Sequence, residues 1–282
     1  MLAQVFNSPF ASLVVLAMAA ACAGPDPGAG GLEPAGTLVP PEVLACRGDR
    51  DGAIAASELP LLAGMVARQR TYEDVAVLSA GVTDDDGLRW DMPEGGRVIE
   101  VRTEPIEDQW FAASFPDATY AVPVDPARDP DDQVLGIYRV VDDEVLLLGT
   151  ASRHPDRPSG GLLMPYDDPP VVLGFPVELG DSWEVTARVS AGTLAGAPFS
   201  SEDTYRIAVD ARGSIHTPDA VIRDALRLRI ALTIRTAAAE PIDRLELVWY
   251  RECLGEVARM TAHDGDAGPE LDSAAGLRVL AF

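Results

Sequence analysis

In the stretch LRLRIALTIR, which spans residues 226–235, every second residue is a large apolar one, and polar residues fill the positions between them except at Ala231. Neighbouring side chains of a β-strand point to opposite faces of the sheet, so this pattern predicts a strand with one buried face and one solvated face. Strands of parallel sheets are usually buried on both faces, whereas antiparallel sheets can leave one face in water. The stretch therefore predicts an antiparallel β-protein.

The same alternation continues on both sides of this stretch. It recurs at residues 183–190, 205–210 and 245–249, and turn-like joints separate these segments. Less regular strands are expected earlier, at residues 98–102, 120–124, 134–141 and 145–149. We therefore expect a mainly β fold over residues 73–282: an antiparallel β-meander that forms a curved sheet, an incomplete barrel or a sandwich.

Two motifs of this region resemble a known kind of protein. FPVELGDSW at residues 175–183 is similar to the FPL-x-x-GD-x-W opening of secreted bacterial β-domains, and WYRECLGEV at residues 249–257 is similar to a later strand end and turn. The resemblance covers roughly residues 170–282. It implies a periplasmic lipoprotein whose β-meander curls into an incomplete barrel, as in the lipoprotein-carrier type of fold. It carries no catalytic residue onto this chain.

A segment ahead of the β region, RGDRDGAIAASE at residues 47–58, has the spacing of an EF-hand calcium loop. Such a loop takes ligands from positions 1, 3, 5, 7, 9 and 12 and needs glycine at position 6. The matching residues are Asp49, Asp51, Gly52, Ala53 through its carbonyl, and Glu58. With one short helix expected at residues 42–45 and another after residue 58, residues 41–72 predict a small EF-hand-like helix–loop–helix.

Arg47 stands at position 1 of this loop. It offers no oxygen ligand and would place a positive charge beside the ion, which weakens binding. Two interpretations stay open. Asp49, Asp51, Ala53 and Glu58 form a weak calcium site, or the loop is degenerate and keeps its shape without metal. The expected cofactor is calcium, bound weakly or not at all.

The amino-terminal region has the layout of a secretory signal. Residues 1–21 carry no charged side chain, and the apolar run at residues 13–20 is too short to span a bilayer. The sequence AAAC that ends at Cys22 resembles a bacterial lipobox, although Ala19 stands where that motif prefers leucine. Plain secretion, with cleavage at residues 21–23, and a buried helix are the alternatives. Residues 22–40 predict a lipidated cysteine followed by a flexible tether rich in Gly, Pro and Ala.

Two further cysteines, Cys46 and Cys253, remain if Cys22 is lipidated. Exported proteins enter an oxidising space, so the pair favours a disulfide that ties the loop to the β region. Two separate buried thiols are the alternative.

Composition limits the classes of function. With 282 residues and 47% hydrophobic composition, the chain can bury a sizeable core. Its net charge of −23 repels phosphate backbones, so no nucleic-acid partner is expected. His154, His216 and His263 have no paired spacing that would suggest zinc. No G-x-S-x-G or phosphate-binding loop is present, and we do not expect an enzyme.

Together these features predict an exported lipoprotein of the cell envelope, anchored through Cys22. We expect an outer-membrane lipoprotein that faces the periplasm or the exterior, and a monomer. It would act as a non-enzymatic binding or structural module for an unknown protein or apolar ligand. The alternatives are a periplasmic carrier that holds a lipid in the curved sheet, and an enzyme whose site is assembled from loops.

Overall fold

The structure is a computed structural model that describes residues 46, 48–59, 61–237, 239–266 and 268–282. Within these residues the elements are β-strands and short 3₁₀-helices, with no α-helix. None of the helices described is long and apolar enough to cross a membrane. The expected signal peptide, Cys22, the tether and the helix at residues 42–45 lie outside the described residues.

The strands of the first half are β1 (Ala53–Ile54), β2 (Val66–Ala76), β3 (Val82–Asp84), β4 (Gly87–Asp91), β5 (Arg97–Arg102), β6 (Tyr120–Pro123), β7 (Val134–Val141) and β8 (Glu144–Ser152). Those of the second half are β9 (Leu162–Pro165), β10 (Val171–Gly174), β11 (Val177–Glu178), β12 (Ser182–Leu194), β13 (Ala197–His216), β14 (Val221–Thr236), β15 (Ala239–Arg251), β16 (Gly255–Thr261) and β17 (Ser273–Leu280). The 3₁₀-helices are Ala56–Glu58, Ala112–Ser114 and Pro130–Asp132.

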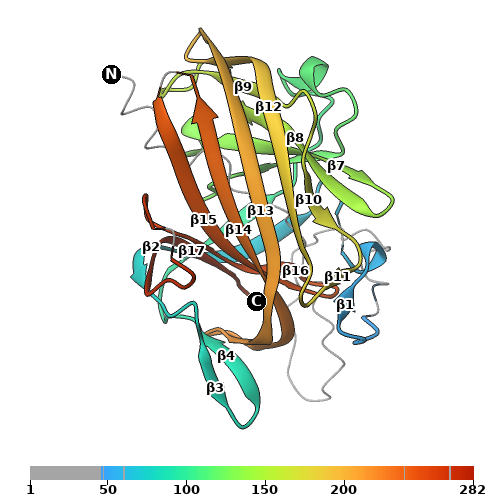
Figure 1. The fold of residues 1–282 in the computed structure, drawn as a ribbon, viewed down its shortest axis with the longest axis vertical. Helices are drawn as coiled ribbons and strands as arrows, with labels where there is room; N and C mark the ends of the chain where they lie inside the picture. The colour runs from blue at the N-terminus through green and yellow to red at the C-terminus, as the bar shows by residue number, and fades with distance from the viewer. Residues whose placement is uncertain (1–45, 47, 60, 238, 267) are drawn as a thin grey trace, which may run out of the picture.

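One large sheet contains 15 of the strands, and β1 and β11 form a separate pair. Its central run from β12 to β17 is a meander, in which each strand pairs antiparallel with the next. Figure 1 shows the long strands β12 to β15 side by side along the molecule. This confirms the expectation of a mainly β, antiparallel fold.

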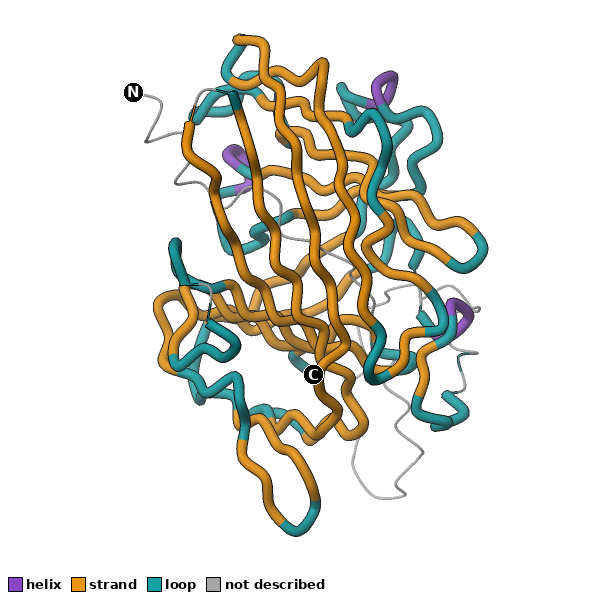
Figure 2. The backbone as a smooth tube through the Cα atoms, in the orientation of Figure 1, coloured by secondary structure: helices purple, strands orange, loops and turns teal. Residues whose placement is uncertain are grey.

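The sheet curves until its ends nearly meet. Its order runs β5-β2-β17-β16-β15-β14-β13-β12-β9-β8-β7-β6. A bridge between Glu104 and Ala121 brings the segment after β5 onto β6, and Figure 2 shows the backbone folding round on itself. The result is a nearly closed, barrel-like sheet.

Side chains fill the space that the sheet encloses. Buried aromatic pairs include Trp90 with Trp249, at a ring-centroid separation of 5.4 Å, and Tyr120 stacked on Tyr138, also at 5.4 Å. One apolar cavity lies among residues such as Leu194 and measures about 40 Å³. A water molecule takes up roughly 30 Å³ of liquid, so this cavity offers no room for an acyl chain.

A buried acid lies beside that cavity. Asp203 is 5% exposed, and the Tyr166 hydroxyl donates to its Oδ2 at 2.6 Å. The hydroxyls of Tyr166 and Tyr205 are 2.8 Å apart. Burial raises the pKa of Asp203, and the hydrogen bond from Tyr166 opposes part of that rise.

The expected helix after the loop is not found. Residues 56–58 form a single 3₁₀ turn, and β2 begins at Val66, so this strand crosses the boundary expected at residues 72 and 73. Leu59 and Leu61 are both buried whereas Leu62 is 40% exposed, which is not helical spacing. The Thr103 hydroxyl donates to the Leu62 carbonyl at 2.6 Å and accepts from the Met65 N–H at 2.9 Å, and these bonds fix an extended path.

Candidate functional site at residues 46–58

The described part of the loop is held by its own aspartates. Asp49 Oδ1 accepts from the Asp51 N–H at 3.0 Å, and Asp51 Oδ1 accepts from the Ala53 N–H at 2.8 Å. Gly52 has a φ of +102°, which favours glycine at this turn. Ala53 and Ile54 then pair with β11. The loop is therefore ordered by local hydrogen bonds and attached to the β body at one edge.

Glu58 closes the loop from its far end. Its side chain accepts from the Asp49 N–H at 3.2 Å and from the Ala55 N–H at 2.9 Å, one with each carboxylate oxygen. Its carbonyl accepts from the Cys253 N–H at 2.8 Å. With 7% of its surface exposed, Glu58 is a buried carboxylate whose two oxygens already have N–H partners.

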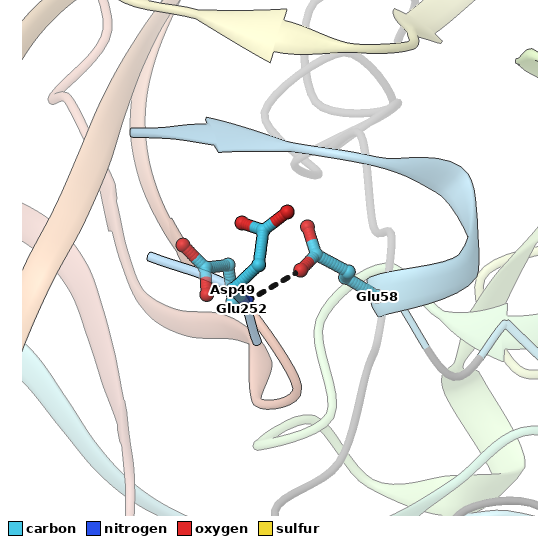
Figure 3. Close-up of side chains that lie close together, drawn as sticks. All are labelled: Asp49, Glu58 and Glu252. Atoms are coloured by element: carbon cyan, nitrogen blue, oxygen red, sulfur yellow. Dashed lines mark hydrogen bonds between the residues drawn. The ribbon is translucent and has the colours of Figure 1, made fainter. Parts of the chain in front are cut away.

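A residue that sequence analysis did not connect with the loop completes the cluster. Glu252 lies in the turn between β15 and β16, is 5% exposed, and accepts from the Arg50 N–H at 3.2 Å. Arg251 Nη1 lies 3.1 Å from the same oxygen. Figure 3 shows Asp49, Glu58 and Glu252 converging, with one oxygen of each within 4.8 Å of the others.

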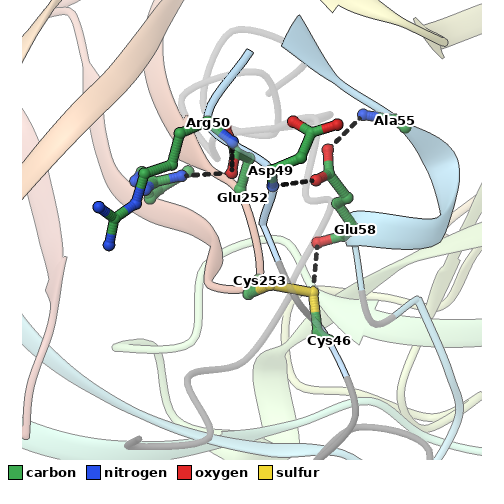
Figure 4. The surroundings of a disulfide bond; sticks show 8 residues. Cys46, Asp49, Arg50, Ala55, Glu58, Glu252 and Cys253 are labelled. Carbon is green, nitrogen blue, oxygen red and sulfur yellow. Dashed lines mark hydrogen bonds and ion pairs between the residues drawn. A yellow bond between two sulfur atoms is a disulfide. The ribbon is translucent and has the colours of Figure 1, made fainter. Parts of the chain in front are cut away.

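A disulfide between Cys46 and Cys253 joins the loop to the same turn. Figure 4 shows it directly below the carboxylates. Cys46 Sγ also lies 3.7 Å from the Glu58 carbonyl oxygen. A disulfide sulfur carries no hydrogen, so this is a contact rather than a hydrogen bond. The disulfide and the hydrogen bond from the Cys253 N–H to the Glu58 carbonyl both attach the loop to the turn between β15 and β16.

The donor set can be compared with what calcium needs. Three carboxylates offer the oxygen ligands that calcium prefers, but a full site takes six to eight oxygens. Of the residues expected from the sequence, Asp49 and Glu58 belong to the carboxylate cluster, whereas Asp51 does not. Arg47 lies outside the described residues. The oxygens of Glu58 accept loop N–H groups and one oxygen of Glu252 lies beside Arg251, so protein contacts hold two of the three carboxylates in place.

One other arrangement resembles catalytic machinery. Ser214 Oγ lies 3.4 Å from His216 Nε2, and His216 Nδ1 lies 3.9 Å from Asp91 Oδ1. These residues lie on β13 and β4, which pair in parallel. The second distance is too long for a hydrogen bond, and the His216 side chain is 39% exposed. The alignment that activates a serine nucleophile is therefore absent at this place.

The described residues thus form a nearly closed, mainly antiparallel β-sheet. The loop at residues 46–58 precedes the strands of this sheet in the chain and is attached to it by a disulfide. No protein-family model matches the chain, and no curated protein matches it. Among solved structures, the chain is similar to a Bacteroides fragilis protein that is described as exported and as having a YmcC-like fold. The two chains are 14% identical with a TM-score of 0.38, and the match covers 78% of this chain and 96% of that one. The chain is also similar to a protein described as a lipoprotein from Parabacteroides distasonis, at 12% identity and a TM-score of 0.33 over 78% of this chain and 95% of that one. Values this low transfer no function to this chain.

Proposed function

We propose that the chain is an exported lipoprotein of the cell envelope, anchored through Cys22, whose β body is a non-enzymatic binding or structural module. The observation that carries this proposal is the disulfide between Cys46 and Cys253. Such bonds persist in oxidising compartments and are rare in the bacterial cytosol. The signal-like residues 1–21 support the same route, and the lipobox-like sequence before Cys22 supports the anchor.

Within this proposal, the loop at residues 46–58 is a structural clamp. It fixes the point where the tether would meet the β body, through the disulfide and through the hydrogen bond from Cys253 to Glu58. The second candidate is a weak calcium site in the same loop. The convergence of Asp49, Glu58 and Glu252 favours a cation, whereas the N–H partners of Glu58 favour the clamp.

The carrier alternative requires an apolar interior with room for a chain. The space inside the described sheet is filled by side chains such as Tyr120, Tyr138 and Trp249, all of them fully buried. The apolar cavity of about 40 Å³ is much smaller than a typical ligand pocket, which measures roughly 300–1,000 Å³. A packed interior supports a module that binds at its surface or serves as a scaffold.

Labelling cells with radioactive palmitate tests the anchor. The wild-type chain should take up label and fractionate with membranes, and Cys22→Ala should lose both properties. Cys46→Ser is the matched control, because it removes another cysteine and should keep the label. An unlabelled wild-type chain would refute the anchor.

A further inference from the structure

The loop at residues 46–58 divides into a firmly packed part and a loosely held part. Ala53 and Ile54 pair with β11, and Ile54 is 2% exposed in the hydrophobic core. Residues 48–51 are exposed, and Gly52 is half-buried. We call residues 48–52 the loop arm. Because none of its side chains is buried, the loop arm depends on other contacts for its position.

The contacts that hold the loop arm end on one turn, at residues 251–254 between β15 and β16. Cys46, just ahead of the loop arm, forms the disulfide with Cys253. The Arg50 N–H donates to Glu252 Oε2 at 3.2 Å, and among the described residues this is the one hydrogen bond from the loop arm to the β body. Its length lies at the upper end of the usual range for N–H···O bonds. The disulfide is therefore the main attachment of the loop arm.

Three carboxylates meet where the loop joins this turn. Asp49 and Glu58 come from the loop, Glu252 comes from the turn, and one oxygen of each lies within 4.8 Å of the others (Figure 3). Glu58 is 7% exposed and Glu252 is 5% exposed, so their charges are screened less than charges at the surface. Gly48 allows Glu252 to come close, since a Cβ at this position would collide with Glu252 Oε2. Like charges at such distances repel one another.

One guanidinium opposes this repulsion. Arg251 Nη1 lies 3.1 Å from Glu252 Oε2. Arg50 contributes its backbone N–H, but its side chain is exposed. Arg212, which lies near the loop arm, pairs with Asp224 at 2.9 Å. Three carboxylates beside one guanidinium leave an excess of negative charge across the junction that the disulfide closes.

We propose that the disulfide between Cys46 and Cys253 is a redox-controlled latch, and that its reduction releases the loop arm from the turn. Both cysteines are half-buried, which leaves the bond close to the surface. The reductant would be a dithiol: one thiolate attacks a sulfur of the bond, and the second breaks the resulting mixed disulfide. The reductant leaves as a disulfide, and its two thiol protons end on Cys46 and Cys253. The carboxylates then separate, while Ala53 and Ile54 stay paired with β11.

Release of the loop arm would lengthen the tether of the proposed lipoprotein. With the latch closed, the tether meets the β body at Cys46, and with the latch open it meets the body at Ala53. At roughly 3.3–3.6 Å per residue, the stretch between them adds up to about 25 Å of reach. The inference rests on the proposed clamp, and its effect on reach rests on the anchor at Cys22. Failure of the latch would appear in redox measurements and failure of the anchor in palmitate labelling, so the two can be told apart.

Equilibration of the purified full chain with reduced and oxidised dithiothreitol, in the presence of EDTA, measures how readily the latch opens. Alkylation followed by mass spectrometry gives the fraction of chains that keep the disulfide. Glu252→Gln removes one charge of the carboxylate cluster and keeps the shape of the side chain. Asp51→Asn removes a charge of the loop arm outside that cluster and is the matched control. Circular dichroism verifies that the β body of each chain stays folded when reduced.

Glu252→Gln should shift the equilibrium toward the disulfide by about tenfold, because less repulsion opposes its closure. Asp51→Asn should shift it by less than about twofold, because its charge is exposed and screened. In the wild type, reduction should accelerate hydrogen exchange at residues 48–52 by at least about tenfold and leave β14 unchanged.

Three results would overturn the proposal. These are the same redox equilibrium in the wild type and Glu252→Gln, unchanged hydrogen exchange of the loop arm after reduction, and unfolding of the whole β body by reduction.

Discussion

Glu58 connects three parts of the molecule. Its carboxylate accepts N–H groups from Asp49 and Ala55, and its carbonyl accepts from Cys253. Hydrogen bonds to a charged group each contribute about 1.5–3 kcal/mol, and a buried carboxylate without partners would be costly. A single residue therefore contributes both to the shape of the loop and to its attachment to the β body.

Asp203 is a buried acid that sequence analysis did not single out. It lies on β13 opposite Ala187 and accepts from Tyr166, within the apolar wall of the small cavity. Burial raises the pKa of its carboxyl above the usual 3.8, so the folded state holds this proton more tightly than the unfolded chain. Its contribution to stability is therefore largest below pH 3.8 and is lost as the pH rises through the raised pKa.

Asp203→Asn should make this pH dependence visible. The free energy of unfolding of the wild type minus that of the variant should fall from about pH 4 to pH 7, by about 1.4 kcal/mol for each unit of pKa elevation. Urea unfolding at several pH values measures the difference. Asp108→Asn, which removes a carboxylate at an exposed position, is the matched control. A flat profile for Asp203→Asn would show that the folded state does not raise this pKa.

At the scale of elements, the long strands could be predicted because the alternation of apolar and polar residues reflects a difference in burial between the two faces of each strand. Leu228, Ile230 and Leu232 are buried on β14, as the pattern indicates. The helix after the loop was predicted wrongly, because the apolar residues there enter the core from an extended segment. The contact between Glu252 and the loop could not be read from spacing. The only indication in the sequence is that Glu252 directly precedes Cys253, the expected disulfide partner of Cys46.

The disulfide is the element-scale feature with the largest expected effect on stability. It joins residues separated by 207 positions, and closing so long a loop restricts the unfolded chain strongly. Cys46→Ser should lower the free energy of unfolding by about 2–5 kcal/mol in urea titrations. Cys253→Ser should match it, and the double variant should lose nothing more, since all three remove the same bond. A Cys46→Ser chain that unfolds at the wild-type urea concentration would contradict this.

At the scale of the whole molecule, the meander was predictable but its closure was not. Pairing of β2 with β17, and of β13 with β4, joins segments far apart in the sequence. No local pattern specifies such partners, because alternation reports which face of a strand is buried and not which strand lies beside it.

The central claim is that the loop at residues 46–58 is a clamp completed by protein contacts, without a cation. Thermal unfolding of the full chain with and without calcium tests it directly. A site with a dissociation constant near 0.1 mM would add about 2.7 kcal/mol at 10 mM calcium. For a body of this size that corresponds to a rise of about 5–10 °C in Tm. We predict no rise beyond the one that magnesium produces at the same concentration. A calcium-specific rise of that size, lost in Glu58→Gln, would contradict the clamp and establish a calcium site.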